Sequence, residues 1–234
     1  HVIQHGSFCV YTKTYCMQVE ISIPSSLKEV KLKDYQDYLL IENPTNDDLL
    51  KCILKVDQNK LGKIKASDVD FLLGNVLDLF KQKHDFIPKF KMSGNEYGFI
   101  PNLDEITYGE NKDVTAYIND WGTMHKAMAV LFRPIKQKQR NKYLIEEYEG
   151  SHKYSETMKE MPLDVVMGAM VFFYNLTNVL LKSMPSFLKK EAEKEQMQGV
   201  ISPENGEAIQ KYILLLKQTS QNLNKLQSFP YINA

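Results

Sequence analysis

The spacing of apolar residues along the chain predicts a mainly helical protein. Apolar side chains recur every three or four positions, which places them on one face of a helix. The clearest stripe runs from Val69 to Phe80, and a second contains Met124, Ala127, Met128 and Leu131. The expected helices cover residues 32–40, 47–54, 67–80, 107–119, 121–132 and 162–181. Asn46 or Asp47 is the expected cap of the second helix.

A second pattern, with a period of two, predicts a few short strands. Residues 18–23 alternate apolar and polar side chains, as a half-buried strand does. Residues 86–91 and 97–100 are expected to pair across a tight turn at Ser93–Glu96, and Lys142–Ile145 is a further strand. The first three strands would form one small antiparallel sheet. The fold class is therefore mainly α with a small antiparallel β-sheet (α+β).

The chain divides into three parts by composition. Residues 1–16 show no clear period, and Met17 precedes a well-formed strand pattern, so we interpret 1–16 as an upstream or non-native leader. Residues 17–182 form the α+β body, and residues 183–234 a C-terminal helical extension with a Lys/Glu-rich stretch and a final helix from Pro203. One stripe of that helix is the candidate partner face: Ile209, Tyr212, Ile213, Leu216 and Leu223.

Composition narrows the classes of partner. A hydrophobic content of 43% with 25% charged residues is ordinary for a soluble globular protein. The net charge of zero argues against nucleic acid as partner, and the local basic run Lys136–Lys142 is interpreted as a solvated loop. The longest apolar run, Val165–Tyr174, is about half of what a bilayer span needs and is expected to be a buried helix, with no membrane partner.

One segment partly matches a calcium-binding loop. Asp57, Asn59 and Asp68 occupy the first, third and twelfth places of an EF-hand pattern, with glycine at the sixth. Leu61 at the fifth place cannot ligate, and three lysines add positive charge. The alternative is a polar connector between two helices, with Ser67 capping the second, and we expect no metal or other cofactor.

Catalytic patterns are not evident in the sequence. His125 has no histidine or cysteine four residues away, so we interpret it as a helix-face histidine bonded to the backbone or to solvent. Asp104 and Glu105 are explained by the start of a helix. The chain contains no nucleophile elbow, phosphate-binding loop or dinucleotide fingerprint, so an enzyme is not expected.

Five segments together resemble a family encoded by large tailed bacteriophages, including crAss-like and marine phages. They are Ile23–Gln36, Tyr97–Glu110, Asp120–Ile135, Tyr148–Gly150 and Met161–Val165. The shared core of the motif is expected at Trp121, Met124, His125, Met128, Arg133 and Pro134. The chain departs from the pattern at Gly109–Asp113, where the helix start is more charged than expected.

The resemblance implies a non-enzymatic role in phage morphogenesis. A tail assembly chaperone, acting through helix faces in the host bacterial cytoplasm, is the first expectation. The alternative is a structural component of the neck, tail or baseplate in the virion. The partners would be a phage structural or tape-measure protein, or further copies of the same chain.

Overall fold

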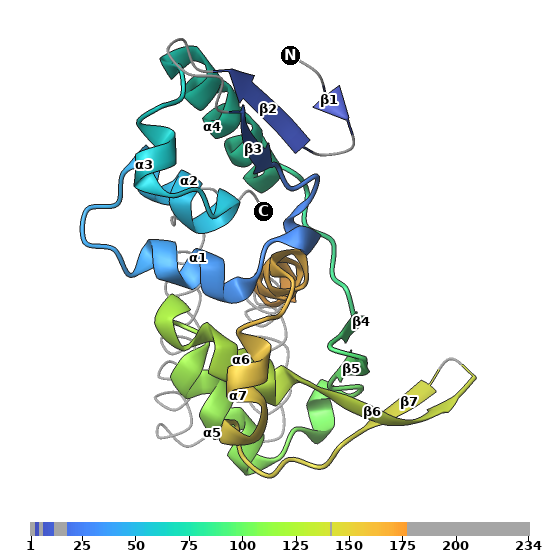
Figure 1. Cartoon of the computed structure of the whole chain (residues 1–234). Coiled ribbons are helices and arrows are strands. Elements are labelled where there is room, and N and C mark those ends of the chain that lie inside the picture. The colour runs from blue at the N-terminus through green and yellow to red at the C-terminus, as the bar shows by residue number, and fades with distance from the viewer. Residues whose placement is uncertain (1–2, 5–6, 12–17, 141, 177–234) are drawn as a thin grey trace, which may run out of the picture.

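The computed structural model describes residues 3–4, 7–11, 18–140 and 142–176 (Figure 1). These residues form a mainly helical body with antiparallel sheets, which confirms the α+β class. The C-terminal extension, with the partner face around Ile209, lies outside the described residues, as does most of the interval 1–16. No helix in the described part of the chain is both long enough and apolar enough to cross a lipid bilayer.

Four helices and a short 3-10 turn build the N-terminal half of the body. They are η1 (Leu27–Glu29), α1 (Leu32–Leu39), α2 (Asn46–Leu54), α3 (Gln58–Leu61) and α4 (Ala66–Phe80). The predicted apolar stripes point inward, since Leu49, Leu50, Leu72 and Val76 are fully buried.

The predicted helix caps were wrong by one or two residues. Thr45 caps α2, because its hydroxyl accepts from the amide of Asp48 at 3.3 Å and the Asp48 carboxylate accepts from the Thr45 amide at 3.0 Å. Thr45, Asn46 and Asp47 are all good capping residues, so sequence alone did not separate them. Ser67 lies inside α4, whose N-cap position is Lys65.

The strands form two separate sheets, which corrects the single sheet expected from the sequence. In the first, β1 (Ile3–Gln4), β2 (Ser7–Tyr11) and β3 (Gln18–Ser22) are joined in chain order. In the second, the order is β4 (Lys89–Met92), β5 (Asn95–Phe99), β6 (Phe132–Gln139) and β7 (Lys142–Ile145). The strand at 18–22 therefore pairs with the segment before it, a local partner, and not with the later hairpin.

The strand β6 replaces the end of an expected helix. The helical segment ends at Leu131, after η3 (Trp121–Thr123) and α6 (Met124–Leu131), and Phe132 already belongs to β6. Pro134 lies within this strand, paired with Tyr97, and its carbonyl accepts from the amide of Glu146 at 2.9 Å. A proline lacks an amide donor, so its presence predicted the end of the helix and argued against a strand at this position.

The remaining helices complete the core. They are η2 (Leu103–Glu105), α5 (Tyr108–Tyr117), α7 (His152–Met158) and a helix described over residues 163–176. The α6 stripe is fully buried, and residues 165–169 at the start of the last helix are all buried, so both were correctly predicted as core. The last helix begins beside α1, where the amide of Leu163 donates to the carbonyl of Val30 at 2.8 Å.

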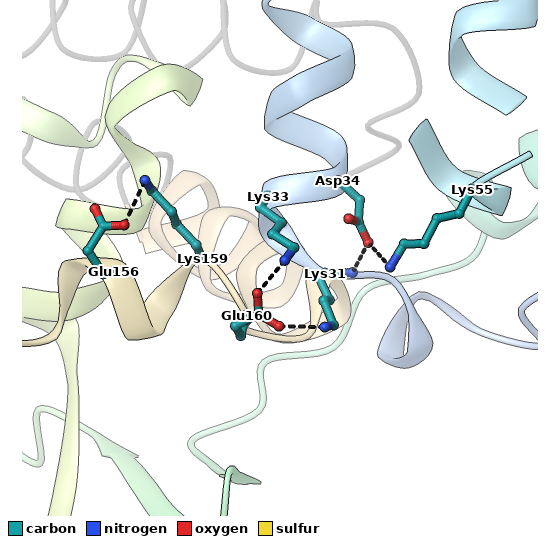
Figure 2. Close-up of polar contacts among 7 residues, drawn as sticks. All are labelled: Lys31, Lys33, Asp34, Lys55, Glu156, Lys159 and Glu160. Atoms are coloured by element: carbon teal, nitrogen blue, oxygen red, sulfur yellow. Dashed lines mark hydrogen bonds and ion pairs between the residues drawn. The ribbon is translucent and has the colours of Figure 1, made fainter. Parts of the chain in front are cut away.

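An exposed group of charged side chains joins α1 to the segment that precedes the helix at residues 163–176 (Figure 2). Glu160 accepts from Lys31 and from Lys33, both at 2.5 Å. We call Lys31, Lys33 and Glu160 the α1 ion cluster. Hydrogen bonds from the two lysines lower the pKa of Glu160 to about 2.

Candidate protein-binding groove

An open groove lies where the second sheet meets the loop that leads into α5. Its volume is about 770 Å³. Three aromatic rings form the base of its lining, and their centroids are 5.0 Å apart for Phe86 and Phe99 and 4.5 Å apart for Phe86 and Phe172. These rings come from three places far apart in the sequence, so no local motif could have indicated the groove.

The two sides of the groove carry different charges. The loop after β5 contributes Leu103, Asp104 and Glu105 to the lining, and the β6–β7 hairpin contributes Lys142 and Leu144. Leu144 is 61% exposed, which is unusual for a large apolar side chain. The groove thus combines an aromatic base with an acidic and a basic side.

The β6–β7 hairpin extends away from the helical body (Figure 1). Its distal residues 136–140 and Lys142 are exposed and carry four positive charges: Lys136, Lys138, Arg140 and Lys142. Lys138 forms an ion pair with Glu96. The basic run was therefore wrongly interpreted as a loop, because its alternating glutamines and lysines lack the apolar partners that usually mark a strand.

A buried ion pair fixes the root of this hairpin on α5. Arg133 of β6 donates to Glu110 at 2.5 Å, and the two side chains are 7% and 5% exposed. Glu110 also accepts from the amide of Thr107 at 2.7 Å, within a capping box. The Arg133 guanidinium lies over the ring of Tyr148 at 5.5 Å, and the Tyr148 hydroxyl donates to Asp113. We call these five residues the hairpin anchor.

The electrostatics of the hairpin anchor favour the ion pair. Burial alone would raise the pKa of Glu110, but the two hydrogen bonds from Thr107 and the charge of Arg133 outweigh it, and the pKa is lowered. Burial and the neighbouring Asp113 raise the pKa of Tyr148. The Arg133 Nε and Nη1 atoms have no hydrogen-bond partner among the described residues, so Glu110 is the acceptor on which this buried charge depends.

The hairpin anchor accounts for the charged helix start that departed from the phage-family pattern. Glu110 closes the capping box and pairs with Arg133, while Asp113 accepts from Tyr148. The two carboxylates of Gly109–Asp113 therefore make structural contacts with β6 and with the segment after β7. In the sequence these charges were visible only as a departure from the expected pattern. The residues that they contact could not be predicted from local spacing.

A second polar contact joins other motif residues. The Gln36 amide donates to the carbonyl of Trp121 at 2.5 Å and lies 3.1 Å from Nδ1 of His125. His125 is 8% exposed, and the neighbour of its Nδ1 is a side-chain amide, which the sequence did not indicate. Burial lowers its pKa, and Lys159 lowers it further.

The remaining motif residues divide between core and sheet. Met124 and Met128 are fully buried in α6 and provide packing, while Pro134 lies in β6 beside Arg133. None of these motif residues lines the groove. The lining instead includes residues of another of the five segments, Tyr97–Glu110, among them Phe99, Asp104 and Glu105.

The partial calcium motif folds as a helical connector. Gln58–Leu61 form α3, beginning after Asp57, and Asp68 lies in the first turn of α4. Asn59 is an exposed residue of α3. In the part of the chain that the structure describes, no group of three or more His, Cys, Asp or Glu side chains lies close enough to hold a metal ion.

Comparison of the chain with protein-family models, with curated proteins and with solved structures finds no match.

Proposed function

We propose that the protein is a non-enzymatic phage morphogenesis protein, a tail assembly chaperone, that binds an amphipathic helix of another phage protein. The observation that carries this proposal is the groove of about 770 Å³ with Phe86, Phe99 and Phe172 at its base. The phage context rests on the family resemblance of the five motif segments.

The chemistry of the groove suits an amphipathic helix. Such a helix places its apolar face in a groove through residues at three- and four-residue spacing and leaves its polar face in water. An aromatic base accepts the apolar face, and the charged rims at Asp104 and Lys142 contact the polar flanks. A tape-measure protein contains long helices of this kind, which need covering until the tail assembles around them.

The test is direct binding of peptides that span the apolar helices of the tape-measure protein from the same phage. Calorimetry should show binding to the wild-type chain, weakened about tenfold or more by Leu144→Asp, which places a charge in the apolar lining. Leu40→Asp is the matched control, because Leu40 is 71% exposed and does not line the groove. Equal affinities of both variants and wild type would reject the groove as the binding site.

The extended hairpin favours a second candidate, a structural component of the neck, tail or baseplate. A basic β-hairpin that leaves the body is suited to contact a neighbouring subunit in a symmetric ring. Quantitative mass spectrometry of purified particles separates the two roles. Many copies per virion would support the structural role and contradict the chaperone role.

A further inference from the structure

We propose that the groove is also the docking site of the chain's own C-terminal segment, residues 203–217, which competes with the phage partner. The claim that the segment competes with a phage protein rests on the function proposed above. The docking itself rests on three features of the chain: where the helix at residues 163–176 leads, the order of charges on the groove, and the order of charges on the segment.

The described chain ends next to the groove. Phe172 lines the groove, and the described part of its helix ends four residues later at Leu176. Residues 177–202 separate this point from the segment. Twenty-six residues span up to about 85 Å when extended and about 40 Å when helical, so the connection is long enough to return to a groove that begins beside it.

The charges on the groove have a fixed order. The hairpin side is basic, with Lys142 in the lining and Arg140 beside it at the turn. The loop after β5, a separate element of the lining, is acidic, with Asp104 and Glu105. A bound segment is therefore favoured when it carries negative charge at one end, apolar residues in the middle and positive charge at the other end.

The segment 203–217 has this order. Glu204 and Glu207 come first, the apolar stripe from Ile209 to Leu216 follows with Lys211 within it, and Lys217 ends the segment, so that its first part is acidic and its second part basic. The stripe uses the spacing of three, four and seven residues that places side chains on one helix face. Docking would set the two glutamates against the hairpin and Lys217 against the acidic loop.

The proposal is tested in the full chain with a photo-crosslinking amino acid in place of Leu144. We expect crosslinks to peptides within residues 203–217, and none to that segment from the same group placed at Leu40, an exposed position outside the groove. Mixing isotopically light and heavy chains identifies the donor of the segment. Light–light and heavy–heavy products support docking of the chain's own segment, and mixed products would overturn it in favour of a second copy.

A charge exchange tests the orientation. Glu207→Lys and Lys142→Glu should each lower the crosslinking yield about two- to fivefold, as for an exposed ion pair, and the double variant should restore it. Lys142 can be changed without disturbing the core, since it is exposed. Equal yields in all four chains would contradict the proposed orientation and with it the docking.

The two proposals fail differently. If crosslinks to residues 203–217 form but no tape-measure peptide competes with them, the docking holds and the chaperone function does not. If a peptide binds in a Leu144-dependent manner but the segment does not crosslink, the function holds and the docking is rejected. If both hold, Glu207→Lys should strengthen peptide binding about two- to fivefold, because the competing segment is released.

Discussion

Two groups of ions join distant parts of this chain, and they differ mainly in burial. The hairpin anchor connects α5 to β6 through side chains that are 5–7% exposed, whereas the α1 ion cluster connects α1 to Glu160 through side chains that are 37–41% exposed. The same carboxylate–cation chemistry therefore has two consequences. Water can replace a lost partner in the exposed cluster, but a charge in the anchor depends on its partner being present.

The largest expected effect is that of Glu110→Gln, which leaves the Arg133 charge buried without its counter-ion. We expect the free energy of unfolding to fall by about 3–5 kcal/mol, measured by chemical denaturation. Glu149→Gln is the control, since Glu149 pairs with Lys153 but is 65% exposed, and it should cost less than about 1 kcal/mol. Similar losses from both variants would mean that burial does not set the cost of removing one partner of an ion pair.

A smaller effect is expected from Tyr148→Phe, which keeps the ring over Arg133 and removes only the hydroxyl. The hydrogen bond to the Asp113 carboxylate is lost, and bonds to charged acceptors contribute about 1.5–3 kcal/mol. Because Asp113 is partly exposed and water can take the place of the hydroxyl, the lower end of that range is expected. A loss as large as that of Glu110→Gln would show that the hydroxyl, and not the ion pair, dominates the anchor.

The smallest effect, and the one that depends most on pH, is expected from Glu160→Gln. The pKa of Glu160 is lowered to about 2 from an ordinary value of 4.5, so the ionised carboxylate stabilises the folded state fully above pH 4.5. This contribution is lost as the pH falls from 4.5 towards 2. Wild type should therefore exceed the variant in stability by less than about 1 kcal/mol at pH 7, and the difference should vanish near pH 2. A difference that stays constant over this range would contradict the ionic role of Glu160.

The sequence predicted elements whose signal is local and periodic. The stripes of α4 and α6 and the strand Lys142–Ile145 were correct, because spacing alone specifies them. The tight turn was also correct in place but shorter than expected, since it covers Ser93–Gly94 and β5 already begins at Asn95. The pairing of β4 with β5 was also confirmed, but the sheet expected for β3 was wrong, since that sheet depends on contacts that spacing does not record.

The candidate site was less predictable than the fold. Phe86, Phe99 and Phe172 approach one another only after folding, so the groove has no sequence signature. In the sequence, the pairing of Glu110 with Arg133 appeared only as an unexplained excess of charge in the first turns of α5. Both features depend on residues brought together across long sequence separations.

Gly98 lies on β5, but the absence of a side chain there affects how the β6–β7 hairpin packs. The ring of Tyr143, from β7, covers Gly98 on β5, and its hydroxyl donates to the carbonyl of Phe99 at 2.8 Å. A Cβ atom at position 98 would lie 2.4 Å from that ring, so any side chain there would push Tyr143 outward. A relative with a larger residue at this position would present an identical hairpin at a different angle, and could thereby change its partner without changing a single contact residue.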